Sequence, residues 1–296
     1  DFMVRQRRLI GISKDQQGQT VQGARSALWY SWLERVQKPQ EKRLERAVWS
    51  YLKGAKKRYK ERLQEAWDRQ KATGPAQTKA MDYTEITDRA EEERILTEQL
   101  TRPWLEGWEL QGGQSFTEVF QLAGIPIPEG EIFGTRQQAQ GMIAKSVQNI
   151  TKTTIDKLDV IIQTGIVEGQ GIDEIERAIS RSTGFDRARA RLIARTEATR
   201  SVNVATLQAW EKAQTLGIDM QKEWASAQDD LVRPLHVELD GQTVGIRENF
   251  VVGDHVGPAP GEFADAGMVC NCRCTMHPIV NLAGSTQLAT PYDLPF

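Results

Sequence analysis

Residues 203–227 read NVATLQAWEKAQTLGIDMQKEWASA, and the change of pattern inside this stretch decides the fold. Before Gly217, apolar residues such as Leu207 and Trp210 recur at the three- and four-residue spacing of a helix. After Gly217 the helical period is lost, and residues 222–227 have the pattern of a strand. We therefore predict an α+β chain in which helices are followed by strands.

Long helices are expected throughout the chain before this point. Apolar residues recur at helical spacing over residues 25–72, 82–110, 135–166, 172–181 and 185–215. The first of these helices is interrupted near Lys38-Pro39, because proline disfavours helix in the residue before it. Two prolines bounded by glycines make residues 124–130 a connector. We expect a long-helix-rich N-terminal half and a compact C-terminal module of helices packed on a small mixed β-sheet, whose last strand covers residues 270–280.

Charge is distributed unevenly and supports a division into three segments. Residues 38–71 contain 12 Lys and Arg against 5 Asp and Glu, whereas residues 216–296 contain 4 against 11. Six of the 11 prolines also lie in the second of these stretches, as is typical of loops and turns. We predict a helical N-terminal region (1–130), the helical part of a second module (131–215) and its strand- and loop-rich part (216–296).

Composition excludes several classes of protein. With 39% hydrophobic and 26% charged residues among 296, the chain can bury a core and is not disordered as a whole. No run approaches about 18 apolar residues and no charged-then-apolar leader is seen, so we expect neither a membrane partner nor a signal peptide. All three cysteines fall within five residues, which is no disulfide framework and fits a reducing compartment such as a cytoplasm.

The cysteines form the sharpest candidate site, because thiolate and imidazole are the preferred ligands of tetrahedral zinc. The candidate ligands are His236, Cys270, Cys272 and Cys274. Side chains two apart in a straight strand are separated by about 6–7 Å, whereas two sulfurs on one zinc lie within about 4 Å. A structural zinc site therefore requires a bend at Asn271 or Arg273. Two other interpretations stay open, namely buried thiols packed as small apolar side chains and catalytic chemistry.

Polar residues lie where helix 185–215 is expected to be apolar. An unpaired amide at Asn203 would cost about 1–3 kcal/mol, so we expect this side chain to bond a buried group such as the backbone of the strand layer. The predicted buried polar network comprises Arg195, Glu197, Asn203, Asp230 and His236. The alternative is an active site in which Glu197, Asp230 and His236 act as acids and bases.

A basic helix over residues 40–72 offers a weak nucleic-acid surface, in which basic residues interleave with aromatic ones. The candidate DNA contacts are Lys53, Lys56, Lys57 and Lys60. Acidic residues of the same helix, among them Glu41 and Glu61, can form helical salt pairs with the basic ones. Contact with DNA and an ordinary solvated or partner-facing helix therefore both stay open.

No sequence motif requires an enzyme. The chain contains neither type of glycine-rich phosphate loop, no H-E-x-x-H and no G-x-S-x-G. We therefore predict that the protein is not an enzyme. The main rival is a metal-dependent hydrolase or nuclease that uses Asp230, His236 and the cysteines.

The second half of the chain carries an ordered set of short motifs. The set is ARLIARTE (190–197), Asn203, KEW (222–224), DLVRPLH (230–236), LDGQ (239–242) and NCRC (271–274). Each piece alone is weak, but the ordered set resembles the phage head morphogenesis family, the minor head proteins similar to protein F of phage Mu. The resemblance covers about residues 140–280, roughly half of the chain.

This resemblance implies a structural minor capsid protein of a tailed bacteriophage, bound at or near the portal inside the head. Such a protein aids head assembly, and a role in DNA packaging or ejection follows from its place. The implied partners are the portal protein, the major capsid and scaffold proteins and packaged dsDNA, with multiple copies around the portal. It is assembled in the host cytoplasm and located in the virion. The alternative within this setting is a DNA-binding accessory protein of the virion.

The chain departs from the family pattern around the cysteines. Many relatives carry a cysteine pair where this chain has Arg233 and His236. Relatives also carry a histidine shortly before the final Cys-Arg-Cys, which is missing here unless His277 substitutes for it. Some relatives have a toxin domain after this module, whereas only 22 residues follow Cys274 here, so the toxin version is not expected.

Overall fold

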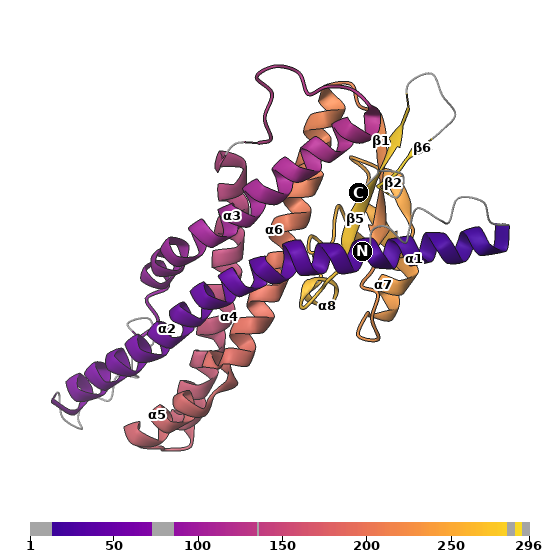
Figure 1. Cartoon of the computed structure of the whole chain (residues 1–296). Coiled ribbons are helices and arrows are strands. Elements are labelled where there is room, and N and C mark those ends of the chain that lie inside the picture. Colours follow the sequence, from indigo (N-terminus) through magenta and orange to yellow (C-terminus); the bar gives the residue numbers. More distant parts are fainter. Residues whose placement is uncertain (1–13, 73–85, 135, 283–287, 292–296) are drawn as a thin grey trace. The chain divides into compact units, whose positions relative to one another are not determined.

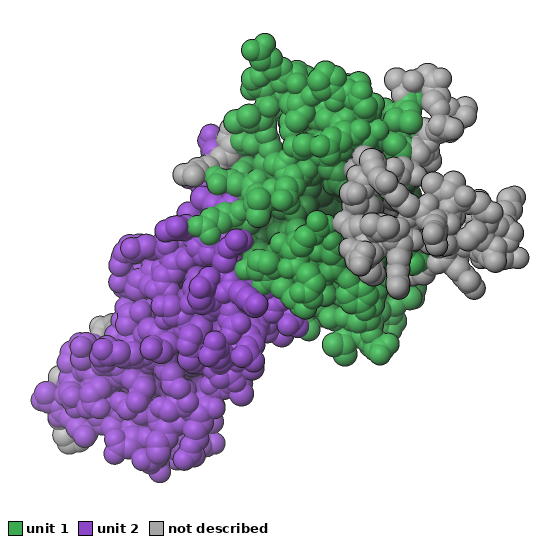
Figure 2. Space-filling view, in the orientation of Figure 1, with its two compact units in different colours: residues 1–40, 106–135, 198–296 green, residues 41–105, 136–197 purple. Residues whose placement is uncertain are grey.

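The computed structural model describes residues 14–72, 86–134, 136–282 and 288–291 and confirms the α+β class (Figure 1). Residue contacts group the chain into two compact units (Figure 2). The first unit contains Asp1–Gln40, Glu106–Thr135 and Ala198–Phe296, and the second contains Glu41–Leu105 and Arg136–Glu197. This grouping differs from the sequence division at residues 130 and 215, which stays a prediction.

The interruption expected near Lys38-Pro39 is a change of helix type. Helix α1 (Lys14–Trp32) leads into a π-helical turn, η2 (Leu33–Gln37), and α2 (Lys38–Ala72) follows without a loop. The Lys38 amide donates to the Leu33 carbonyl, which is the five-residue bond of a π-helix. Pro39 has no amide hydrogen to donate, and it is tolerated because it lies in the first turn of α2.

The remaining helices lie close to their predicted bounds. Helix α3 (Arg89–Ala123) runs past the expected end at residue 110 and contains Pro103, and residues 124–130 form the predicted connector. The helices that follow are α4 (Arg136–Val167), α5 (Ile172–Arg181), the short 3₁₀ turn η5 (Thr183–Phe185) and α6 (Arg187–Thr215). None of the helices in the described part of the chain is both long and apolar enough to cross a membrane.

The second unit is built from helices alone among its described residues. Its core contains the apolar stripe that the spacing of α2 predicts, including Leu44, Val48 and Leu52, all of which are fully buried. Arg58 of α2 pairs with the buried Glu92 of α3 through two hydrogen bonds of 2.8 and 2.6 Å. A buried carboxylate is stable when it is paired in this way.

The first unit contains the strands, and their pairing corrects one prediction. The main sheet has the order β2-β1-β5-β6, and every neighbouring pair is antiparallel, so the expectation of a mixed sheet was wrong. The strands are β1 (Met220–Ala225), β2 (Thr243–Gly245), β5 (Thr275–Asn281) and β6 (Leu288–Ala289). The pairing of β1 with β5 sets Trp224 opposite Met276. A separate hairpin joins β3 (Phe250–Val252) to β4 (His255–Gly257).

The second half of α6 packs on this sheet in the core of the first unit. Trp210 of α6 and Trp224 of β1 belong to one buried cluster, together with Phe120 of α3 and Phe250 of β3. Two short helices complete this unit: α7 (Pro234–Leu239) follows the turn after β1, and α8 (Ala266–Val269) lies directly before the cysteine segment. The core therefore holds in place the elements that carry His236 and the cysteines.

Candidate functional site

The cysteine segment bends where the distance between sulfurs requires it. The final strand begins at Thr275 and not at residue 270 as expected, because the chain turns between α8 and β5. Asn271 has φ +60°, and it is the one non-glycine residue with positive φ in the described part of the chain. Asn tolerates this left-handed conformation better than most residues. Of the two positions at which a zinc site requires a bend, Asn271 and Arg273, the chain thus bends at Asn271.

This bend brings two sulfurs and one imidazole together. The Nδ1 atom of His236 lies 3.7 Å from Cys272 Sγ and 3.4 Å from Cys274 Sγ. The three potential ligand atoms all lie within 4.8 Å of one another, and all three residues are buried. Thiolate sulfur and neutral imidazole nitrogen are suitable donors for zinc. The arrangement therefore provides three donors that could hold one metal ion.

The electrostatics of the pair favour one thiolate. Hydrogen bonding from Cys274, and then from His236, lowers the pKa of Cys272 well below its usual range, although burial acts against this. Burial, and then the hydrogen bond with Cys272, raises the pKa of Cys274 well above its usual range. Two thiols this close share a proton, and the thiolate is the form that binds metal.

Side chains from distant segments hold the backbone of this turn. Thr199 Oγ1 donates to the Cys272 carbonyl at 2.5 Å, and Trp29 Nε1 donates to the Arg273 carbonyl at 2.8 Å. Asn203 Nδ2 donates to the Cys274 carbonyl at 3.0 Å. The prediction that Asn203 bonds a buried backbone group is thus confirmed. Three successive carbonyls of the cysteine segment are fixed by side chains of α1 and α6.

Cys270 and His277 do not join the three donors. Cys270 is half-buried, and its carbonyl accepts a hydrogen bond from Arg233, the residue before α7. His277 is buried in β5, where burial and the charge of Arg25 lower its pKa to about 4. Within the described residues, the group that could hold a metal contains His236, Cys272 and Cys274 alone. The proposed fourth ligand, Cys270, is therefore not part of it.

The other members of the predicted polar network have separate partners. Arg195 pairs with Glu41 at 3.0 Å, and Glu197 accepts a hydrogen bond from Ser146. Asp230 was expected to be buried, but it is exposed in the turn after β1. Its neighbour Asp229 is the residue that forms an ion pair, with Arg273 of the cysteine segment. The predicted network is thus divided, and Asp230 is the wrong one of two adjacent aspartates.

The four lysines predicted to contact DNA lie along α2, and three of them already have protein partners. Lys56 donates to the Ser180 carbonyl at 2.6 Å, and Lys60 pairs with Glu176 at 2.9 Å. Lys57 lies 3.6 Å from Glu61 on the same helix, and Lys53 is exposed. These pairs agree with the interpretation of an ordinary solvated helix, which the acidic residues of the helix suggested.

Together these features define an α+β protein with long helices, in which a small antiparallel sheet borders a buried His-Cys-Cys cluster. Residues 156–277 match the family described as Phage Mu protein F like protein. This region contains α5, α6, β1 and the cluster. The resemblance drawn from the ordered motifs is confirmed: this region of the chain is Phage Mu protein F-like.

Three curated proteins show similarity over comparable regions. The minor head protein GP7 of Bacillus phage SPP1 is 35% identical over 123 residues, which are 41% of this chain and 40% of that protein. The NAD(+)–arginine ADP-ribosyltransferase EFV of Enterococcus faecalis (strain ATCC 700802 / V583) is 37% identical over 134 residues, which are 45% of this chain and 26% of that protein. The uncharacterised protein YqbB of Bacillus subtilis (strain 168) is 25% identical over 145 residues, 47% of this chain and 46% of that protein.

The chain spans less than half the length of each of these relatives, between 26% and 46%. Their names therefore describe whole proteins of which only one region is shared with this chain. No solved structure matches the chain significantly.

Proposed function

We propose that the protein is a structural minor head protein of a tailed bacteriophage. The observation that carries this proposal is the match of residues 156–277 to the Phage Mu protein F-like family, supported by 35% identity to a minor head protein of Bacillus phage SPP1. The same region contains the helix, the strand and the cysteine segment that carry the ordered motifs. This region contains buried apolar residues and hydrogen-bonded polar side chains, which is consistent with a structural role.

We further propose that the protein lies inside the head near the portal vertex of the virion. The portal protein, the major capsid and scaffold proteins and packaged dsDNA are its proposed partners, and several copies surround the portal. The long helices α2 and α3 have exposed polar faces on which such a partner can dock. Roles in packaging or ejection follow from this location and are part of the same proposal.

In this proposal, a metal bound by the His-Cys-Cys cluster has a structural role. His236, Cys272 and Cys274 would hold a zinc ion, because sulfur and imidazole donors suit zinc better than magnesium or calcium. All three side chains are buried. A catalytic zinc must keep a position open for water and substrate. Three protein donors leave one of the four positions of zinc open, but burial of all three keeps a substrate away from it, which supports a clip that joins α7 to the cysteine segment before β5 and argues against the hydrolase or nuclease alternative.

The transferase name of the Enterococcus relative does not extend to this chain. The shared stretch is 26% of that protein and 45% of this chain, about as long as the stretch that is shared with the phage minor head protein. The parsimonious interpretation is a common structural module in both proteins. We accordingly propose that this chain is not an enzyme.

Two measurements test the proposal. Quantitative mass spectrometry of purified heads and purified tails should find the chain in heads, at a few copies for each portal ring. The chain mixed with the portal protein of the same phage should co-migrate with portal rings in size-exclusion chromatography, with the tail-tube protein of that phage as the matched negative control. Absence from heads refutes the head assignment. Presence in heads without co-migration leaves that assignment standing and refutes only portal binding.

A further inference from the structure

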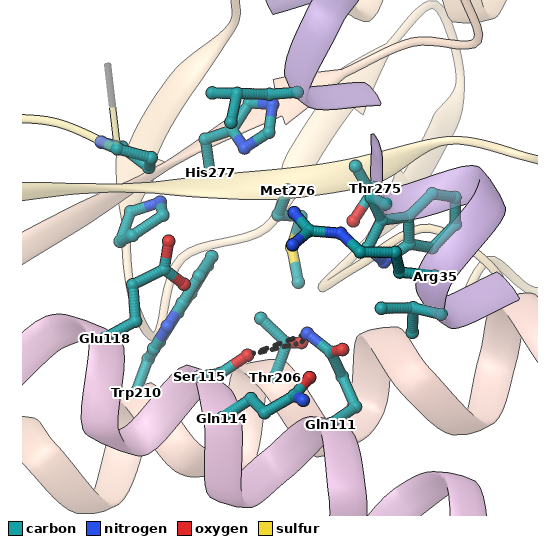
Figure 3. A pocket seen from close by; sticks show the side chains of 15 residues that line it. Arg35, Gln111, Gln114, Ser115, Glu118, Thr206, Trp210, Thr275, Met276 and His277 are labelled. Carbon is teal, nitrogen blue, oxygen red and sulfur yellow. Dashed lines mark hydrogen bonds between the residues drawn. The ribbon is translucent and has the colours of Figure 1, made fainter. Parts of the chain in front are cut away.

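A cavity of about 250 Å³ lies within the first unit, away from the cysteine cluster (Figure 3). Its walls are formed by α1 and η2, α3, α6 and the first residues of β5. Polar side chains reach it from each of the last four elements, including Arg35, Glu118, Thr206 and His277. Pockets for drug-sized ligands measure about 300–1,000 Å³. This cavity lies just below that range and therefore suits a ligand smaller than a typical drug molecule.

Two opposite charges face this cavity without pairing with each other. Arg35 is exposed on the π-helical turn η2, and Glu118 is half-buried on α3; Figure 3 shows them on opposite sides of the space. Among the residues that the structure describes, neither side chain has a hydrogen-bond or ion-pair partner. Most other carboxylates in the cores of this chain, such as Glu92, are paired. π-Helical turns are rare and are frequent at functional sites.

Two buried polar atoms of the same cavity also lack partners in the described part of the chain. They are the Trp210 indole N–H, a donor, and the Gln111 amide oxygen, an acceptor. The amide nitrogen of Gln111 is already used, because it donates to Ser115 and Thr206 at 3.0 and 3.3 Å. A buried polar atom without a partner costs about 1–3 kcal/mol. The cavity thus offers one cation, one anion, one donor and one acceptor to a ligand.

We propose that this cavity binds a small zwitterion, an aminocarboxylic acid whose carboxylate pairs with Arg35 and whose ammonium group pairs with Glu118. The guanidinium is a planar donor that matches a carboxylate with two parallel hydrogen bonds. The ammonium group has three N–H donors, which suit the Glu118 carboxylate and the Gln111 oxygen. This site is independent of the proposed role in the phage head.

The dependence of affinity on pH follows from the groups that face Glu118. Burial raises the pKa of Glu118 to about 7. Across the cavity it faces the guanidinium of Arg35 from η2 and His277 from β5, whose pKa is lowered to about 4 and which is therefore neutral. The side chains from α1 and α6 that line the cavity are uncharged. Binding of an ammonium group should therefore strengthen between pH 6 and pH 8, as the Glu118 carboxyl loses its proton.

The test is a titration of the full-length protein with probes of increasing charge separation: glycine, β-alanine and γ-aminobutyrate. Isothermal titration calorimetry should show one-to-one binding of at least one probe. Propanoate and propylamine, which carry only one of the two groups, should bind at least about tenfold more weakly. No binding of any zwitterion at millimolar concentration overturns the proposal, and so does propanoate or propylamine binding as tightly as the zwitterions.

Two variants test whether Arg35 and Glu118 bind the two charged groups of the ligand. Arg35→Gln and Glu118→Gln should each weaken binding at least about tenfold, and Glu118→Gln should also abolish the rise of affinity with pH. The matched controls are Arg46→Gln and Glu109→Gln, which change exposed residues of the same types outside this cavity. Urea unfolding of each variant checks that it is folded. Binding that both cavity variants retain in full overturns the assignment.

Discussion

Replacing Asn203 by alanine should destabilise the protein through the cysteine segment. The Asn203 side chain is fully buried on α6 and makes three hydrogen bonds. Its Nδ2 atom donates to the carbonyls of Thr199 at 2.9 Å and Cys274 at 3.0 Å, and its Oδ1 atom accepts from Thr275 at 3.2 Å. The Asn203→Ala variant removes all three bonds and leaves the partners inside the core.

The magnitude follows from what the partners lose. The Thr199 carbonyl lies within α6, so it keeps its helical position, and losing the side-chain bond costs little there. The Cys274 carbonyl and the Thr275 hydroxyl lose a partner in a buried place, which costs about 1–3 kcal/mol each. Alanine returns roughly half a kcal/mol through its better helix propensity. We therefore expect the free energy of unfolding to fall by about 1.5–5.5 kcal/mol.

Equilibrium unfolding in urea measures this change, with the midpoint and the slope recorded by tryptophan fluorescence and far-UV circular dichroism. The matched control is Asn149→Ala, which changes an exposed asparagine of α4 and should leave stability equal or slightly higher. A loss of less than about 0.5 kcal/mol in Asn203→Ala, which is the size of an ordinary surface substitution, would refute the conclusion that Asn203 fixes the cysteine segment.

Three further predictions test other parts of the molecule. If His236 and the two cysteines hold zinc, elemental mass spectrometry should find about one zinc for each chain. The double variant Cys272→Ser/Cys274→Ser should lose the zinc and have a lower melting temperature. The single variant Cys270→Ser is the control that should keep the metal. Burial lowers the pKa of Lys222 to about 8, below its unfolded value, so the folded state loses this proton first as the pH rises. The free energy of unfolding should therefore increase from pH 8 towards pH 10 by up to about 1.4 kcal/mol per pH unit. The Lys222→Met variant, compared in the same urea titrations, should lack that increase, and equal slopes in both proteins would contradict the assignment. If α2 contacts DNA, Lys53→Gln with Lys57→Gln should reduce the salt slope of binding by about 2, and a binding curve that does not change between about 50 and 200 mM salt would exclude such contact altogether.

The helices were predictable because their signals are local. The predicted helix at residues 172–181 has the same bounds as α5, since Gly171 precedes it and its amide donates a hydrogen bond to the Glu174 side chain in the first turn. Strand pairing was less predictable. The antiparallel arrangement of β1 and β5 joins residues 50 to 60 apart in sequence, and no local pattern shows in which direction the partner strand runs.

The part of the candidate site that could be predicted is the part where the spacing of the cysteines restricts how they can bind one metal ion. Two sulfurs two residues apart cannot approach one ion along a straight strand, so a bend near Asn271 followed from geometry. The prediction that Asp230, and not Asp229, forms the buried contact was wrong because the sequence does not show in which direction the side chains of two adjacent turn residues point. Trp29 was not identified as part of the site, since it lies 244 residues before the Arg273 carbonyl that it bonds.

The hydrogen bonds of the cysteine segment also limit what a metal can contribute. Small zinc domains fold only with their metal, because little else orders the ligands. Here the carbonyls of residues 272–274 are bonded by Thr199, Trp29 and Asn203, and Arg273 is paired with Asp229. Since the protein itself orders the donors, a bound zinc stabilises a turn that already exists. Metal loss should therefore lower stability without unfolding the chain, and the same fold can persist in relatives whose ligand residues differ.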